Sequence, residues 1–172
     1  MKTRLPCILL ATLSICLSSC LFQEPVFTEG FVKPDPGLAG VWVTEDETGD
    51  PRGREFAVLT PAGTESFMLH YPAGAGAGSY FEVRPLKIAE KNIWQVRLVL
   101  TFEDGLPKTG TPVYTLLLVE QASDGGLSVR SLKNEGDHTT SAAATKKALE
   151  EKAPNWDALF GEAKIFTRLK DR

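Results

Sequence analysis

The stretch NIWQVRLVLTF, from Asn92 to Phe102, alternates between two kinds of side chain. One face carries Trp94, Val96, Leu98, Leu100 and Phe102, and the other carries Gln95, Arg97 and Thr101. A strict period of two is typical of a β-strand with one buried face. We therefore expect this segment to form a half-buried strand whose bulky face is turned toward a core.

Similar short segments flank this stretch on both sides, with proline, glycine and aspartate at the junctions. We expect strands over residues 40–46, 54–60, 65–71, 79–88, 112–122 and 127–134. Residues 112–122 are almost wholly apolar and should form the most buried strand. The sequence EDGLPKTGT, residues 103–111, is expected to be a hairpin loop around an Asp104–Gly105 turn. Strands at this spacing predict a mainly β fold, an antiparallel meander or small barrel of about seven to eight strands.

The pattern changes near the C-terminus. Residues 139–161 have a helical composition, and Thr140 or Ser141 can cap the start of the helix. Pro154 is expected to begin a second short helical turn. Residues 163–169, AKIFTRL, should form a final strand. Pairing of that strand with residues 40–46 would close the sheet and remove both exposed edges.

The N-terminus has the pattern of an export signal. Lys2 and Arg4 precede a nearly continuous apolar run, residues 5–17, and small residues follow. A secretory signal has this order of charge, apolar core and small residues. The run is shorter than the roughly 20 apolar residues that a membrane-spanning helix needs. The sequence therefore predicts export.

The signal ends in Leu17-Ser18-Ser19-Cys20, which resembles the lipobox of bacterial lipoproteins. The resemblance implies transfer of a lipid to the Cys20 thiol, cleavage before Cys20, and anchoring to a membrane without a span. Several acyl chains on one residue hold a protein far more firmly than one chain does. Leu21 rather than aspartate follows the cysteine, which in this family points to the outer membrane of the cell envelope. An uncleaved signal anchor or an ordinary secreted protein is the alternative.

Removal of the signal would change the composition of the chain. The chain has three cysteines; two would leave with the signal and the third would carry lipid, so none remains for a disulfide, a reactive thiol or a thiolate metal site. Loss of the two basic residues at the start would change the formal net charge from −3 to −5. Because the basic residues are scattered, with no run beyond Lys146–Lys147, we expect no nucleic-acid partner.

The chain is thus expected to have three parts. A signal peptide covers residues 1–19, an extended tether covers residues 20–37, and a single β-rich domain covers residues 38–172. The tether is rich in proline and has no sustained periodicity. Drawn out at about 3.1 Å per residue, roughly 16 residues would reach about 50 Å. Docking of Phe27 and Phe31 on the domain would shorten that reach.

Gly40-Val41-Trp42 stands at the head of the first expected strand. It resembles the Gly-x-Trp signature of lipocalins and related calycins, which are small antiparallel barrels that often carry apolar ligands. The resemblance implies that Gly40 lets the chain enter the barrel tightly, that Trp42 plugs the closed end, and that a basic side chain from a late strand lies across the ring. Arg130 and Arg168 are the candidates, and Arg168 is preferred because its strand would neighbour the first.

The same resemblance implies a barrel interior that either holds a small apolar molecule or is filled by side chains. An eight-stranded barrel is just wide enough for either. The candidates for ligand contacts come from two expected strands: Trp94, Leu98, Phe102, Tyr114 and Leu116. The bulk of these side chains favours a filled interior.

Other polar patterns fall short of a catalytic or metal site. His70 and His138 are the two histidines, fewer than the three or four ligands of a typical metal centre. Ser66 is close to His70 in sequence, but no Gly-x-Ser-x-Gly motif surrounds a serine, so hydrolysis is only a third hypothesis. The glycine-rich residues 73–79 and the acidic residues 45–50 are interpreted as a flexible loop and a solvated turn. We expect no enzyme activity, no cofactor and no metal.

Two classes of function remain. The first is a structural or interaction module anchored in the cell envelope, with an envelope protein as its partner. The alternative is a lipocalin-like carrier of a small apolar ligand. The two differ in whether the barrel is filled or hollow.

Overall fold

The computed structural model describes residues 21–44, 53–74, 77–103, 105–122, 124–133, 141–151 and 154–169. Cys20, His138, the expected signal peptide and the acidic residues 45–50 lie outside these ranges. The predictions that concern them remain predictions.

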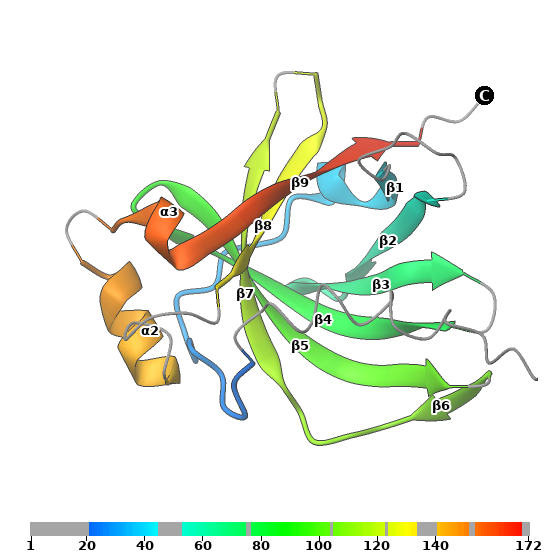
Figure 1. Ribbon diagram of the computed structural model, residues 1–172, viewed down its shortest axis with the longest axis horizontal. Coiled ribbons are helices and arrows are strands. Elements are labelled where there is room, and N and C mark those ends of the chain that lie inside the picture. The colour runs from blue at the N-terminus through cyan, green and yellow to red at the C-terminus, as the bar shows by residue number, and fades with distance from the viewer. Residues whose placement is uncertain are drawn as a thin grey trace, which may run out of the picture.

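Eight antiparallel strands form a closed barrel (Figure 1). Around the barrel the order is β4-β3-β2-β1-β9-β8-β7-β5, and pairing between β5 and β4 completes the circle. The strands are β1 (Gly40–Thr44), β2 (Glu55–Ala62), β3 (Ser66–Gly74), β4 (Ala77–Ile88), β5 (Lys91–Glu103), β7 (Tyr114–Gln121), β8 (Leu127–Leu132) and β9 (Phe160–Arg168). The mainly β fold predicted from the alternating segments is confirmed, and of the two predicted architectures it is the barrel.

The first and last strands close the barrel, as the sequence predicts. Trp42 of β1 faces Arg168 of β9, and the Leu169 N–H donates to the Val41 carbonyl at 2.9 Å. Alternation along β9 turns Phe166 inward, where it is 8% exposed, whereas Ile165 is 48% exposed on the outer wall. The closing strand thus contributes Phe166 to the core inside the barrel.

A ninth strand was not expected. β6 (Leu106–Lys108) pairs with the end of β5, outside the circle, where a hairpin loop was predicted. It is only three residues long and contains Pro107, which cannot donate to a ladder, so no periodic pattern marks it.

The inward side chains form one apolar core to which every strand of the circle contributes. Its buried members are Trp42, Ala57, Leu59, Phe67, Val83, Trp94, Val96, Val119, Leu127 and Phe166. In a barrel the interior and exterior residues alternate along each strand. The alternation seen at Trp94 and Val96 therefore predicts the inward face of β5 correctly.

The alternation of β5 is interrupted by a bulge at Val99. Phe81 of β4 faces Leu98, whereas the preceding residue, Tyr80, faces Leu100. An extra residue in one strand reverses the faces that follow. Beyond the bulge, Phe102 lies on the outer wall with its ring centroid 5.9 Å from that of Tyr80. The expectation of one continuous apolar face from residue 94 to residue 102 is therefore wrong beyond Leu98.

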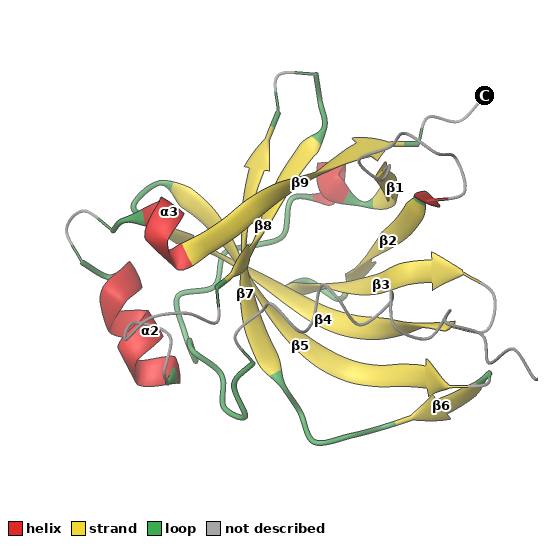
Figure 2. Cartoon of the chain, viewed as in Figure 1, coloured by secondary structure: helices red, strands yellow, loops and turns green. Residues whose placement is uncertain are grey.

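Helices α2 (Ala142–Leu149) and α3 (Trp156–Leu159) lie outside the barrel wall (Figure 2). They contribute to a second apolar core on that side of the wall. Its buried members are Phe22, Val26, Phe27, Leu86, Ile93, Leu116, Leu118, Leu132, Ala148, Leu149, Leu159 and Phe160. Strand β7 separates the two cores, with Leu117 and Val119 facing inward and Leu116 and Leu118 facing outward. This double burial explains the almost wholly apolar sequence of β7.

The two helices begin at capping residues. Ser141 accepts a hydrogen bond from the Ala144 N–H at 3.1 Å, as predicted for α2, and Asn155 accepts one from the Ala158 N–H at 3.2 Å in α3. Among the residues described, none of the helices has both the length and the hydropathy to cross a membrane.

Residues 22–32 cross the outer wall of the barrel. Phe22 exchanges two backbone hydrogen bonds with Tyr114 at the start of β7, each 2.8 Å long. Farther along the chain, the Val32 N–H donates to the Pro85 carbonyl of β4 at 2.9 Å. These contacts provide partners for backbone N–H and C=O groups of β7 and β4 that are not hydrogen-bonded to a neighbouring strand of the circle.

Between these two contacts, Gln95 of β5 holds the segment. Its side-chain amide accepts from the Phe27 N–H at 2.8 Å and donates to the Phe27 carbonyl at 2.9 Å. Phe31 lies beneath the Arg84 guanidinium, whose central carbon is 3.7 Å from the ring centroid. Phe27 and Phe31 therefore both dock on the domain. Over residues 22–32 the expected tether lies against the barrel.

Candidate ligand cavity inside the barrel

A cavity of about 110 Å³ lies inside the barrel. Its lining is almost entirely apolar: Trp42, Ala57, Leu59, Leu69, Tyr71, Trp94, Leu117, Leu127, Val129, Ser131, Lys164 and Phe166. The bulky inward side chains therefore do not fill the interior completely, which differs from the filled interior that their size favours.

Three polar side chains from three different strands meet at one part of this lining. Lys164 of β9 forms an ion pair with Glu55 at the start of β2 and donates to the Tyr71 hydroxyl of β3 at 3.1 Å. The Tyr71 hydroxyl in turn donates to the same Glu55 carboxylate. We call Glu55, Tyr71 and Lys164 the polar cluster.

The polar cluster is partly open to solvent. The side chains of Lys164 and Glu55 are 36% and 31% exposed, and Lys164 also lines the cavity. Its ammonium nitrogen lies 5.8 Å from the Tyr71 ring centroid. One positive and one negative charge thus balance each other where the apolar cavity meets water.

Trp42 also lines the cavity and is only 4% exposed. It faces Arg168, which is four residues from Lys164 along β9, or about 13 Å at the usual rise of a strand. The Trp42 indole N–H donates to the Leu38 carbonyl at 3.0 Å. Leu38 ends the short helix η2 (Pro36–Leu38), which leads the chain into β1.

Arg168 lies over the Trp42 ring, with its central guanidinium carbon 5.9 Å from the ring centroid. It also donates to the carbonyls of Gly37 and Ala39 at 3.1 and 2.7 Å. Gly40 has a φ of +147°, and a Cβ added there would lie 3.2 Å from the Arg168 Nε. A residue without a side chain is therefore needed where the arginine approaches the entering chain.

The structure thus brings Gly40, Trp42 and Arg168 together, as the lipocalin resemblance implied. The other candidate, Arg130, lies elsewhere. It donates to the carbonyls of Gly161 and Phe160 and pairs with the Asp157 carboxylate at 2.9 Å, so it ties α3 to the barrel wall.

Only part of the predicted ligand site faces the cavity. Trp94 lines it, and Leu98 lies on the same face of β5 by alternation. Phe102 lies on the outer wall because of the bulge. Leu116 is fully buried, but in the second core, and Tyr114 packs against that core as well. Phe102, Tyr114 and Leu116 therefore do not line the cavity. For the two residues of β7 the reason is that helices and the N-terminal segment cover the outward face of the strand, so that its sequence is as apolar as that of an inward face.

The polar cluster was not predicted. A signal for Lys164 was present, because it alternates with Phe166 and Arg168 on one face of the last strand. Glu55 and Tyr71 carry no comparable signal. They lie 109 and 93 residues from Lys164 in the chain, and only barrel closure brings them together.

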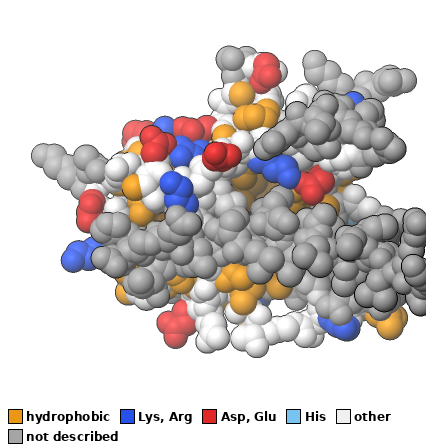
Figure 3. All heavy atoms as spheres, in the orientation of Figure 1, with side chains coloured by type: hydrophobic (Ala, Val, Ile, Leu, Met, Phe, Trp, Pro, Cys, Tyr) orange, Lys and Arg blue, Asp and Glu red, His pale blue; other side chains and the backbone are white. Residues whose placement is uncertain are grey.

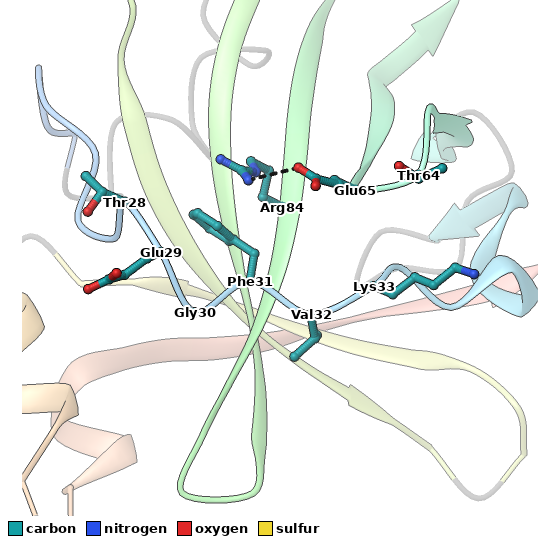
Figure 4. A pocket seen from close by; sticks show the side chains of 9 residues that line it. All are labelled: Thr28, Glu29, Gly30, Phe31, Val32, Lys33, Thr64, Glu65 and Arg84. Atoms are coloured by element: carbon teal, nitrogen blue, oxygen red, sulfur yellow. Dashed lines mark hydrogen bonds and ion pairs between the residues drawn. The ribbon is translucent and has the colours of Figure 1, made fainter.

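A second hollow lies on the outer wall, between the N-terminal segment and the β2–β3 turn (Figure 4). Phe31 and Arg84 lie side by side in it, and Arg84 forms an ion pair with Glu65 at 3.5 Å. Glu65 is 77% exposed in its side chain, so this pair contributes little to stability. The hollow is a wide surface groove in which Arg84 is paired with Glu65 and stacked on Phe31.

Ser66 and His70 do not form a catalytic pair. The Ser66 hydroxyl donates to the Ala62 carbonyl at 2.9 Å, not to His70. The His70 ring stacks on Tyr80 on the outer wall with centroids 4.3 Å apart, and its Nε2 is buried without a hydrogen-bond partner in the described part of the chain. Within those same ranges, no three His, Cys, Asp or Glu side chains gather in a way that could hold a metal ion.

Charged side chains of both signs are interspersed on the face of the molecule seen in Figure 3.

No family model, no curated protein and no solved structure matches the chain. The cavity and the residues around it therefore carry the functional inference.

Proposed function

We propose that this protein is a carrier that binds one small, mostly apolar molecule inside its barrel. The observation that carries the proposal is the cavity of about 110 Å³, lined almost entirely by apolar side chains and bordered by a polar cluster. Small-molecule sites are typically concave and apolar with a few placed polar groups. The closed barrel and the Trp42–Arg168 contact support a lipocalin-like carrier.

The volume limits the ligand. In another protein, an engineered apolar cavity of about 150 Å³ stays dry and binds benzene. A cavity of about 110 Å³ accommodates roughly one six-membered ring or a short hydrocarbon chain. We therefore propose a ligand of that size, or one that places a group of that size in the barrel.

Binding of benzene to the purified protein tests this proposal. Because a ligand that binds only the folded state stabilises it, saturating benzene should raise the Tm and change the emission of the cavity-lining Trp42 and Trp94. Ala57→Leu places three extra carbon atoms in the cavity and should abolish both effects. Val58→Leu is the matched control, because the next residue along β2 faces the outer wall. A wild-type protein whose Tm and emission respond neither to benzene nor to another uncharged molecule of that size contradicts the proposal.

We further propose that the carrier is anchored by lipid on Cys20 in the cell envelope, at the outer membrane. The lipobox-like sequence Leu17-Ser18-Ser19-Cys20 supports this location. A carrier attached to a membrane would collect or deliver a molecule that partitions into lipid. No catalytic step is part of this proposal.

An interaction module is the second candidate function. Phe56 and Ile165 are 37% and 48% exposed on the outer wall. Phe56 lies opposite Val43 of β1, and Ile165 is two residues before Thr167, which lies opposite Val43 on the other side. Apolar side chains gathered on a surface favour contact with a partner protein. Ile165→Glu should then abolish cross-linking to an envelope protein in cells while benzene binding is unchanged. If the protein acts only as a carrier, Ile165→Glu should change neither the cross-linking pattern nor benzene binding.

A further inference from the structure

The polar cluster sets the charge that a ligand of the proposed carrier can have. Lys164 lines the cavity, and its positive charge is already matched by Glu55, to which it is ion-paired. A ligand carboxylate would place a second negative charge beside Glu55. A ligand ammonium would place a second positive charge beside Lys164. Either would leave one charge without a partner at the border of an apolar cavity, which is costly.

The hydrogen-bond donors of the cluster point to a different group. An ammonium has three N–H donors and no acceptor. Contacts to Glu55 and to the Tyr71 hydroxyl engage two of the three donors of Lys164. The third can serve a ligand acceptor in the cavity, and a hydrogen bond from a charged donor is stronger than a neutral one. Ser131, also in the lining, adds a hydroxyl that both donates and accepts.

We propose that the cavity selects an uncharged, ring-sized molecule with a carbonyl or similar acceptor, which accepts a hydrogen bond from Lys164 while the rest of the molecule fills the apolar space. This inference rests on the proposed carrier function and adds the chemical class of its ligand. Glu55 acts as a specificity residue, because its carboxylate cancels the charge that would otherwise attract an acid.

Four probes with the same six-membered ring separate size from chemistry: methylenecyclohexane, cyclohexanone, cyclohexanecarboxylate and cyclohexylammonium. We expect cyclohexanone to bind about five to ten times more tightly than methylenecyclohexane, which has the same shape without an acceptor. Both charged probes should bind at least about ten times more weakly than cyclohexanone. Titrations followed by NMR or tryptophan emission give the four dissociation constants.

Two variants assign the preference to the cluster. Lys164→Met should lose the preference for cyclohexanone over methylenecyclohexane, so that its two dissociation constants become similar. Glu55→Gln leaves the lysine without its counter-ion and should bind cyclohexanecarboxylate about ten times more tightly than the natural protein. The double variant Lys91→Met/Glu120→Gln removes an ion pair on the outer wall, where the two groups are 2.5 Å apart, and should leave all four constants unchanged.

The outcomes distinguish the two levels of the proposal. Equal binding of cyclohexanone and methylenecyclohexane, or binding of the carboxylate as tight as that of the ketone, overturns the inference about ligand class and leaves the carrier function in place. Failure of all four probes and of benzene overturns the carrier function and this inference with it. Should Lys164→Met not fold, the gain of carboxylate binding in Glu55→Gln decides alone.

Discussion

Arg168 contacts the segment where the chain enters β1 through groups that carry no formal charge. Its guanidinium contacts the Trp42 ring and the carbonyls of Gly37 and Ala39, all of which belong to the segment that enters β1. A cation over an aromatic ring is attracted by the negative face of the ring. One side chain of the last strand thereby holds the start of the first.

We expect Trp42 and Arg168 to be energetically coupled. A double-mutant cycle with Trp42→Phe, Arg168→Met and the pair, measured by urea unfolding, should give a coupling energy of about 0.5–2 kcal/mol. The same cycle with Arg130→Met in place of Arg168→Met is the control and should give none, because Arg130 contacts α3 and the start of β9 instead. A coupling energy of zero in the first cycle would show that the contact between Trp42 and Arg168 does not stabilise the protein.

At the scale of an element, β9 closes the barrel, because it pairs with the first strand, β1, on one side and with β8 on the other. It has an apolar residue on each face, Phe166 toward the cavity and Ile165 toward solvent. Its contribution to stability should therefore differ sharply between two adjacent residues of similar hydrophobicity.

Phe166→Ala should lower the free energy of unfolding by about 3–5 kcal/mol, as for other buried aromatic side chains. Ile165→Ala, the matched control, should change it by no more than about 0.5 kcal/mol. Urea denaturation of the two variants measures both values. Similar losses in the two variants would contradict the assignment of the faces of β9.

At the scale of the whole molecule, the N-terminal segment changes how the proposed anchor would act. Phe22 is two residues after Cys20 and is already paired with Tyr114 of β7. Only Leu21 would separate a lipidated Cys20 from the barrel wall. A carrier anchored in this way would be held against the membrane surface rather than reach about 50 Å from it.

Two measurements test this arrangement. Cys20→Ala should abolish labelling with radioactive palmitate. Labelling that persists in the variant would show that Cys20 is not the lipid site. In the labelled protein, residues 22–32 should resist proteolysis, because the buried amide of Gln95 and the second core hold them. Gln95→Ala should expose them to the protease while Arg97→Ala, the next outward residue of β5, does not. Rapid cleavage within residues 22–32 of the natural protein would show a free tether instead.

The amino-acid sequence by itself predicted the eight strands of the circle and the pairing of the last strand with the first. The period of two around Trp94, the turn residues between segments and the final strand 163–169 are local properties, and local sterics and burial decide them. The Gly40-Val41-Trp42 resemblance likewise identified the residues that meet at Arg168. Only the tertiary structure decided which face of each strand is inward. A single extra residue at Val99 turned Phe102 outward, and the helices buried the outer face of β7, so Leu116 has the same local pattern as an inward residue.

The polar cluster shows most clearly the difference between what the sequence determines and what only the tertiary structure decides. Alternation places Lys164 on the face of Phe166, but no local pattern relates it to Glu55, 109 residues earlier. Their contact depends on the register of strands that pair far apart in the chain, and a shift of one residue would turn each side chain to the other face. The sequence therefore predicted a meander or a small barrel. The pairing of its distant strands decided that the barrel closes and that its interior holds a small apolar cavity with one balanced pair of charges at its border.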